Sequence, residues 1–209
     1  GLYEARGRGG QAIIVWPDKD VVAVFTGRGI DVRNEIAPLL AAALRSDEAL
    51  DPNAEAYARL TSAIEKATEP PPAQPVQDLP PMAATVSGTI YRLEPNQFDV
   101  RCISLRFESP MDVMFTLTVG EGTFDLPVGM DGVPRFSESG PTGIPVGVTG
   151  EWTAPMVFEM AYDEVAGPNH LQIRGDFAPT GQSVTLLFTD PAGGFPTQII
   201  PGLASPTCN

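Results

Sequence analysis

Residues 7–27 read GRGGQAIIVWPDKDVVAVFTG. Two apolar runs, 12–16 and 21–26, flank the polar segment Pro17-Asp18-Lys19-Asp20. β-Branched and aromatic residues on both sides of a short polar loop predict a β-hairpin. Both runs are nearly continuous in apolar residues, which is typical of strands covered on both faces. Because an isolated hairpin is only marginally stable in water, we expect this one to be the end of a larger sheet.

Two helices are predicted after the hairpin. Near 34–44, apolar residues recur at helical spacing and predict one buried stripe, with Asp31 or Asn34 as the cap. Asp51 and Pro52 then have the pattern of an N-cap followed by the first helical position. The apolar stripe of this second helix continues through 57–67. The two stripes consist of Ile36, Leu39, Leu40, Ala43 and Leu44, and of Tyr57, Leu60, Ile64 and Ala67.

Six prolines in the segment 68–82 oppose helix and central strand and favour extended polyproline geometry. We interpret this segment as a semi-rigid spacer between a domain at 1–67 and a second domain at 83–203. A tail, 204–209, follows the second domain. A role for the prolines in peptide recognition is the other interpretation.

The second domain consists of short β-patterned runs separated by Gly, Pro, Asn and Asp. Alternation is clear at Val113, Phe115, Leu117 and Val119, which indicates one face toward a core and one toward water. Regular turn spacing predicts an antiparallel barrel or sandwich of about eight to ten strands. The fold class is therefore α+β, mainly β. The expected strands lie near 84–93, 98–108, 112–119, 122–129, 133–138, 144–152, 156–163, 169–177, 182–189 and 195–200.

Charge and cysteine content exclude some classes of function. The formal net charge of −13 argues against binding nucleic acid or an anionic membrane surface. No apolar run approaches the roughly 20 residues of a membrane span. Cys102 and Cys208 form a disulfide in an oxidising compartment or remain two free thiols, and the sequence leaves both open.

The glycines of 7–10, the Pro-Asp-Lys-Asp turn, Thr26-Gly27 and the following helix arrive in an order that resembles a known family. Residues 3–45 resemble the C-terminal end of penicillin-binding-protein-like serine hydrolases, a group of class C β-lactamases, esterases and D-amino-acid peptidases. That family carries a motif of Lys or His, any residue, then Gly on an inner strand. The matching region here is Arg6, Gly7, Arg8, Gly9 and Gly10. It lacks the Lys or His, and its register, 5–7 or 6–8, is open.

The resemblance implies that Arg6 and Arg8, with nearby backbone N–H groups, act on an oxyanion or a substrate carboxylate in an intact enzyme. The other interpretation is that the glycines only permit close packing. No serine begins Ser-x-x-Lys and no tyrosine begins Tyr-x-Asn. We therefore expect no complete catalytic site and no turnover by this chain alone, and interpret it as a fragment that follows a missing N-terminal catalytic portion. The family implies a periplasmic or secreted protein.

A second resemblance covers about 83–190. Residues 87–96 (SGTIYRLEPN) and 126–132 (LPVGMDG) resemble the accessory β-barrel that follows the catalytic domain in D-aminopeptidases and lipocalin-tailed peptidases. It implies a structural, cleft-shaping or subunit-contact role. The loops 139–143 and 190–194 are then the candidates for reaching a cleft.

Other polar and aromatic residues offer little chemistry. His170 is the only histidine, so no histidine-based metal site or triad can form, and no cofactor is predicted. The turn carboxylates Asp18, Asp20, Asp163 and Glu164 are expected to be solvated, since they lack the spacing of a calcium loop. Four aromatic residues of the second domain fill its core or line a cavity. They are Phe115, Trp152, Phe158 and Tyr162.

Three functions therefore remain. The first is the C-terminal part of a β-lactamase-like serine hydrolase, which cleaves an amide or ester through an acyl-enzyme in the intact protein. The second is a lipocalin-like barrel that binds a small apolar ligand without catalysis. The third is an interaction module that self-associates through its exposed hairpin. A continuous internal cavity in 83–200 favours binding, whereas a filled interior favours the accessory role.

Overall fold

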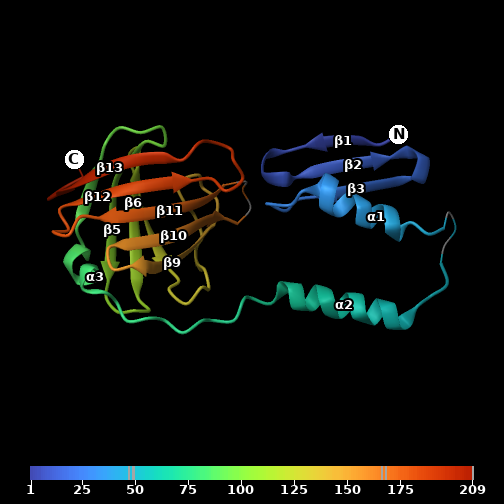
Figure 1. Ribbon diagram of the computed structural model, residues 1–209, viewed down its shortest axis with the longest axis horizontal. Coiled ribbons are helices and arrows are strands. Elements are labelled where there is room, and N and C mark those ends of the chain that lie inside the picture. Colours follow the sequence, from blue (N-terminus) through green and yellow to red (C-terminus); the bar gives the residue numbers. More distant parts are fainter. Residues whose placement is uncertain (47, 49, 166, 168, 209) are drawn as a thin grey trace. The chain divides into compact units, whose positions relative to one another are not determined.

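The computed structural model describes residues 1–46, 48, 50–165, 167 and 169–208. The chain divides into two compact units, Gly1–Pro71 and Pro72–Asn209, each described by itself (Figure 1). The predicted fold class is confirmed, because three strands form one sheet and ten strands form a second.

The first unit contains the predicted hairpin. β2 (Ala12–Trp16) pairs antiparallel with β3 (Val21–Phe25) and with β1 (Tyr3–Arg6), so β2 is the central strand. Between β2 and β3 lies the 3₁₀ turn η2 (Pro17–Lys19), which ends at Asp20 with a left-handed φ of 52°. A second 3₁₀ turn, η1 (Arg8–Gly10), joins β1 to β2.

Only one face of this three-stranded sheet is covered. Ala12 and Ile14 are buried there with Val32 of the π-helical turn η3 (Val32–Ile36), which leads into α1 (Ala37–Ala43). Val22 and Val24 lie on the opposite face and are exposed. Within the described chain η3 and α1 cover one face alone, and the prediction that the hairpin belongs to a larger sheet with both faces covered stays a prediction.

The two helices differ from their predicted form at specific positions. Asp31 caps η3 as predicted, since its carboxylate accepts a hydrogen bond from the Asn34 N–H at 3.1 Å. Leu39 is exposed, so the predicted buried stripe of α1 is wrong. The second helix, α2 (Ala54–Thr68), is capped by Asn53 rather than Asp51, because the Asn53 side chain accepts from the Ala56 N–H at 2.9 Å.

The second unit is an up-and-down antiparallel barrel. Its spatial strand order is β7-β6-β5-β4-β13-β12-β11-β10-β9-β8, so nearly every strand pairs with its neighbours in sequence. The last strand runs to Ser205, beyond the predicted end at residue 200. The strands are β4 (Ile90–Leu93), β5 (Val100–Phe107), β6 (Val113–Val119), β7 (Gly122–Val128), β8 (Arg135–Ser137), β9 (Val146–Ala154), β10 (Val157–Glu164), β11 (His170–Phe177), β12 (Ser183–Thr189) and β13 (Gln198–Ser205).

The barrel closes just after β7. Gly129 forms a parallel bridge with Thr149 of β9. The Gly129 N–H donates to the Val148 carbonyl at 3.0 Å, and the Gly150 N–H donates to the Gly129 carbonyl at 3.0 Å. These bonds join the β7 side of the sheet to β9 and leave few unpaired edge groups.

One end of the barrel carries a helix where the sequence predicts the start of a strand. α3 (Pro81–Val86) lies at one end of the barrel in Figure 1 and buries Met82, Ala83 and Val86. The prediction that the prolines of 80–81 exclude a helix is wrong. Proline is compatible with the first helical turn, where its missing N–H has no partner to lose. These prolines therefore start α3 instead.

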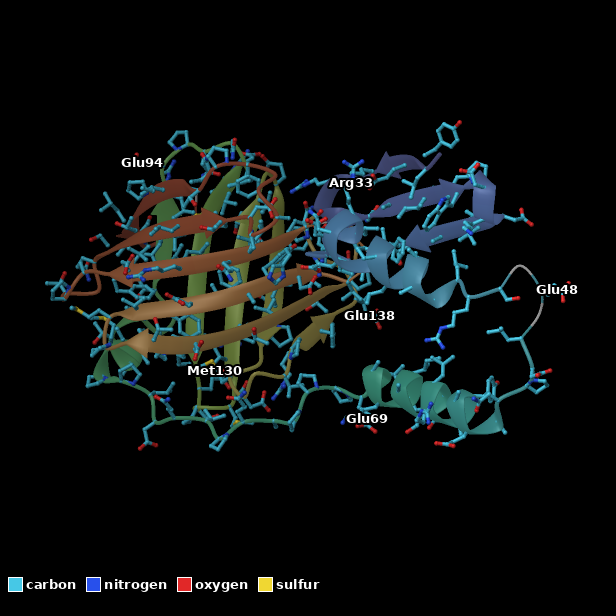
Figure 2. The ribbon with its side chains drawn as sticks, turned by 45° about the vertical axis from the view of Figure 1, so that its right-hand side comes forward. Arg33, Glu48, Glu69, Glu94, Met130 and Glu138 are labelled. Carbon is cyan, nitrogen blue, oxygen red and sulfur yellow. A yellow bond between two sulfur atoms is a disulfide. The ribbon has the colours of Figure 1, made fainter. Side chains whose placement is uncertain are left out.

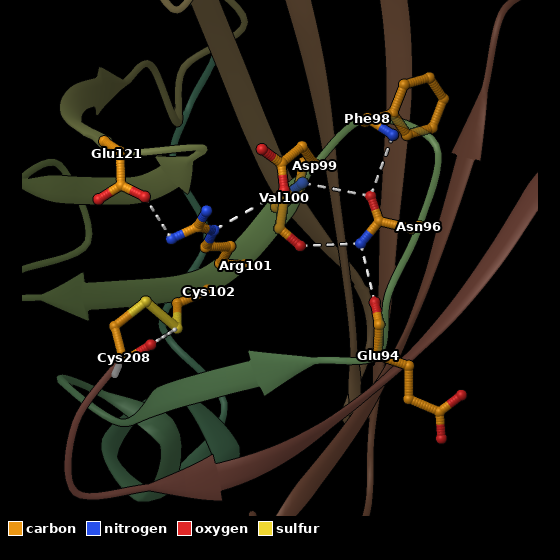
Figure 3. Close-up of polar contacts among 9 residues, drawn as sticks. All are labelled: Glu94, Asn96, Phe98, Asp99, Val100, Arg101, Cys102, Glu121 and Cys208. Atoms are coloured by element: carbon orange, nitrogen blue, oxygen red, sulfur yellow. Dashed lines mark hydrogen bonds and ion pairs between the residues drawn. A yellow bond between two sulfur atoms is a disulfide. The ribbon is translucent and has the colours of Figure 1, made fainter.

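Side-chain bonds and a disulfide fix the segment around β4 and β5 (Figure 3). The Asn96 amide oxygen accepts from the N–H groups of Phe98 and Val100, both at 3.2 Å, which fixes the β4–β5 turn. Cys102 of β5 forms a disulfide with Cys208. The sequence left this pairing open, and the structure decides it.

Reduction of the Cys102–Cys208 disulfide should lower the free energy of unfolding by about 2–5 kcal/mol, because the bond closes a loop with a sequence separation of 106. Denaturant titration of the wild type with and without reductant measures this loss. A Cys102→Ser/Cys208→Ser variant should match the reduced protein and be insensitive to reductant. Equal stability of oxidised and reduced wild type would contradict the prediction.

Gly129→Ala should destabilise the barrel by about 3 kcal/mol or more, since overpacking forces backbone to move. An alanine Cβ at 129 would lie 1.8 Å from the Val133 carbonyl oxygen. Gly175→Ala is the matched control, because Gly175 is also buried in the barrel but its nearest neighbour would lie at 3.5 Å. Thermal unfolding compares the two variants, and equal midpoints would contradict the predicted clash at Gly129.

Candidate ligand-binding end of the barrel

Side chains fill the middle of the barrel. Inward-facing residues from all but the shortest strand form one core cluster, together with Met82 and Val86 of α3. Of the four predicted aromatic residues, Phe115, Phe158 and Tyr162 are buried in this cluster and Trp152 is partly buried against it. The largest fully buried side chains are Tyr91, Phe115, Phe158, Leu126, Ile173, Leu186, Val86, Val128, Val146 and Val148.

Aromatic rings gather toward the end of the barrel that α3 covers. The ring of Trp152 lies 5.5 Å from Phe107, 5.2 Å from Phe158 and 5.9 Å from Phe177, measured between centroids. These four residues, together with Tyr91 at 5.8 Å from Phe177, are called the aromatic cluster. All separations fall in the range in which aromatic pairs attract beyond their buried area.

The position of the aromatic cluster follows from strand ends and from α3. Phe107 and Phe177 are the last residues of β5 and β11, and Trp152 lies near the end of β9. Ser87, directly after α3, accepts a hydrogen bond from the Phe107 N–H through its hydroxyl at 2.9 Å. The helix and the three strand ends therefore meet at one mouth of the barrel.

The indole N–H of Trp152 lacks a partner. Its Nε1 is buried and makes no hydrogen bond with any described group. A buried donor without an acceptor costs about 1–3 kcal/mol. Trp152 as a whole is only partly buried, as is Phe107. The cluster thus combines apolar rings, one unused donor and some access from outside.

The two buried tyrosines lie toward opposite ends of the barrel, Tyr91 beside the aromatic cluster and Tyr162 near the far end of β10. The Tyr91 hydroxyl donates to the Gly181 carbonyl at 2.7 Å and ties β4 to the turn after β11. Burial raises the pKa of Tyr91 to about 12, against a smaller lowering by Thr89. Burial also raises the pKa of Tyr162, with Glu164 adding to the effect.

Every buried charged residue among those described is an acid. They are Asp131, Glu164 and Asp190. Glu164 was predicted to be solvated but is only 2% exposed, because it accepts hydrogen bonds from Thr142 and Asn169, both at 2.7 Å. Asp131 binds Arg135 at 2.9 Å, and Arg135 lowers the pKa of that carboxyl. The barrel interior therefore offers no cation in the part of the chain that the structure describes.

A groove of about 490 Å³ lies on the outside of the same unit. Its walls are the extended segment 74–78, the 130–132 turn that includes Met130 (labelled in Figure 2), and strands β9–β12. Carboxylates such as Glu151 and Glu159 line it. Its described cation, Arg174, is already bonded to Asp176 at 2.8 Å. Carboxylates line much of this groove, and Trp152 of the aromatic cluster is also in its wall.

The predicted region Arg6–Gly10 has a local structural explanation. Arg6 pairs with Glu4, which also binds Arg33 at 3.2 Å (Arg33 is labelled in Figure 2). These two guanidinium groups lower the pKa of Glu4, the Arg6 hydrogen bond most of all. Gly10 has a φ of 103°, and a Cβ there would lie 2.7 Å from the Ile30 carbonyl oxygen. A catalytic role for Arg6, Gly7, Arg8, Gly9 or Gly10 stays a prediction.

The remaining candidates are also placed by the structure. His170 begins β11, and its Nδ1 lies 3.9 Å from Asp163. Within the described residues, no group of three or more His, Cys, Asp and Glu side chains could hold a metal ion. No helix of the described chain has both the length and the apolarity that crossing a membrane requires. The loop 190–194 is closed on itself, since Asp190 accepts from the Ala192 and Gly194 N–H groups at 2.9 and 3.0 Å.

Sequence reasoning named Trp152 but missed its neighbours Phe107 and Phe177. Both lie at strand ends, where alternation predicts which face a residue takes but not which distant strand it meets. The sequence could not predict the unsatisfied N–H of Trp152, because this depends on whether the folded chain brings a hydrogen-bond acceptor close to it.

Comparison with known proteins adds little. No family model matches the chain, and no curated protein matches it. Among solved structures it is similar to "As-p18, an extracellular fatty acid binding protein", with 11% identity and a TM-score of 0.46 over 62% of this chain and all of that one. A likeness at that level carries no argument about what this chain binds. The comparisons give no support for the resemblance to serine hydrolases.

The raised pKa of Tyr91 predicts a loss of stability in alkali. Above pH 10.0, the usual pKa, the unfolded chain releases this proton while the folded chain keeps it until about pH 12. The free energy of unfolding should therefore fall across this range. In Tyr91→Phe it should fall less steeply than in wild type. Denaturant titrations at several pH values measure the slopes, and identical slopes for the two proteins would refute the assignment.

Proposed function

We propose that residues 72–209 form a non-catalytic binding barrel whose ligand is a small, neutral, mostly apolar molecule with one hydrogen-bond acceptor. The observation that carries this proposal is the buried, unpartnered indole N–H of Trp152 within the aromatic cluster. An acceptor atom on a ligand would remove the cost of that orphaned donor. The rings around it would supply apolar contact and stacking.

The charge of the ligand follows from the lack of a buried basic side chain among the described residues. A carboxylate moved from water into this end of the barrel would need a cation, whereas the buried charges are acids, and two of them, Glu164 at the end of β10 and Asp190 after β12, lie at the opposite end. Burial of an unpaired charge is far more costly than burial of a neutral carbonyl. An ester, ketone or alcohol therefore fits better than a fatty acid anion.

The ligand is expected at the mouth of the barrel rather than in its filled middle. Trp152 and Phe107 are partly buried, and the turns beside them carry the exposed methionines Met156 and Met111. Methionine side chains are flexible and polarizable, so they suit an entrance that must adapt to a ligand. Side-chain movement at this mouth would admit a short apolar chain without opening the sheet.

The interpretation as the C-terminal part of a serine hydrolase stays a prediction. A middle filled by side chains is the feature that we expected of an accessory barrel, but it does not distinguish a serine-hydrolase fragment from any other filled barrel. The two are compatible, because an accessory barrel can also bind a ligand at its mouth.

A matched pair of probes, methyl decanoate and the decanoate anion, tests the proposal. The variant Trp16→Phe leaves Trp152 as the single tryptophan, so its emission reports on the site. Methyl decanoate should shift this emission saturably, and decanoate should bind at least about tenfold more weakly. The absence of a saturable shift with either probe would refute the proposal.

Trp152→Phe keeps an aromatic ring but removes the N–H. Calorimetry should show methyl decanoate binding reduced about fivefold or more, the value of one hydrogen bond. Phe136→Leu, at an exposed aromatic residue of β8, is the control and should bind as wild type does. Unchanged binding by Trp152→Phe would show that the indole donor does not contact the ligand.

A further inference from the structure

The first unit buries very little apolar surface. Among its described residues, the buried apolar ones are Ala12, Ile14 and Val32. Even domains of about 60 residues with a full core are marginally stable. The three residues belong to β2 and η3, and neither α1 nor α2 contributes a buried side chain. Further apolar surface packed against the unit would therefore stabilise it.

Its uncovered sheet face shows where that packing occurs. Strand register places Tyr3, Val15 and Val22 in one row across the sheet and Ala5, Ile13 and Val24 in the next. Tyr3, Ile13, Val22 and Val24 are between 47% and 67% exposed. These four residues are called the bare face. A contiguous apolar surface of this kind marks an interaction site.

The two edges of the sheet differ. β1 carries Glu4 and Arg6, and charged side chains protect an edge strand against pairing. β3 reads VVAVF and has no charge, no proline and no glycine. In the described chain β3 pairs with β2 alone, so its other edge is open. An uncharged edge strand rich in β-branched residues favours pairing with another strand.

The chain also contains an uncovered helix stripe. Tyr57, Leu60 and Ile64 follow one another at helical spacing on α2 and are between 57% and 72% exposed. None of the residues of α2 is buried. An amphipathic helix gains most of its stability by burying such a stripe. The bare face and this stripe are complementary apolar surfaces within one polypeptide.

We infer that the open edge of β3 pairs antiparallel with β3 of a second copy of the chain, and that the α2 stripes cover the bare face of the resulting six-stranded sheet. A two-fold axis at Ala23 places Val22 opposite Val24 of the partner, so the strand is self-complementary. The charged β1 edges lie at the two outer sides, and the assembly closes at two copies. This inference does not depend on ligand binding by residues 72–209.

The tether between α1 and α2 permits this arrangement. Residues 44–53 are ten residues long, and an extended chain of that length spans up to about 33 Å. That exceeds the distance of about 20 Å between helix layers on the two faces of one sheet. α2 can therefore reach the face opposite to α1.

Sedimentation velocity tests the pairing of β3. The wild-type chain should sediment as a dimer at about 50 μM, and Val22→Lys/Val24→Lys should sediment as a monomer, with a Kd raised more than about tenfold. Ile199→Lys/Leu203→Lys is the matched control, because these β13 residues are both 67% exposed and also accept two lysines. A monomeric wild type, or a dimer indifferent to the β3 lysines, would overturn the inference.

Hydrogen exchange of the wild type avoids any question of whether the variant folds. Amides of Val21–Phe25 should exchange more slowly at high protein concentration than at low concentration. The dimer should also strengthen as salt rises from about 50 to 500 mM, because two copies with a net charge of −13 each repel one another. Exchange of β3 that is independent of concentration would contradict the pairing.

A separate pair of variants tests the covering helix. Leu60→Glu/Ile64→Glu places two charges in the α2 stripe and should weaken the dimer about tenfold or more. Ala58→Glu/Ser62→Glu adds the same charge on the other side of α2 and should leave the dimer unchanged. A monomer in which α2 is nevertheless protected from exchange would mean that the helix covers its own sheet, and would overturn the inference.

Discussion

The backbone hydrogen bonds between Gly129 and the 148–150 segment of β9 are the constraint on which the second unit depends. Gly129 donates to the Val148 carbonyl and accepts from the Gly150 N–H. A Cβ on Gly150 would lie 2.7 Å from the ring of Phe158 and 2.8 Å from Val128. Closure therefore sets the width of the barrel, and a barrel of this width is narrow enough for its own side chains to fill the middle. The part that remains available for chemistry is the mouth, where strands end and rings meet.

The first unit has no such closure. Its sheet has two edges, one charged and one uncharged, and a helix layer on a single face. Apolar side chains that stabilise a strand when another layer packs on them favour association with other chains when they are exposed. One polypeptide thus contains a barrel that satisfies its own edges and a small sheet that does not. The functions that we propose for the two units reflect this difference: recognition of a small molecule for one, and of protein for the other.

Local chemistry made part of this structure predictable. The hairpin follows from its two β-branched runs, and Asp31 from the known preference for aspartate at helix starts. Alternation in 113–119 predicts the inward face of β6. Other features needed distant contacts or had competing local answers. Asn53 and Asp51 are equally good caps by residue type. Proline can either end or begin a helix, so prolines 80–81 left both outcomes open. The apolar sequence of β3 predicts that Val22 and Val24 are buried, but they are exposed because only one face of the sheet is covered. The candidate site was the least predictable, because it consists of strand ends that converge only in the closed barrel.

The disulfide between Cys102 and Cys208 has a consequence for how the protein matures. Its second sulfur belongs to a residue that follows every strand of the barrel in the sequence, so the disulfide can form only after all of the strands have been synthesised. Chains synthesised in a compartment that keeps thiols reduced would reach the same topology without the disulfide. The redox state of the surroundings therefore determines whether the folded barrel also carries the covalent cross-link.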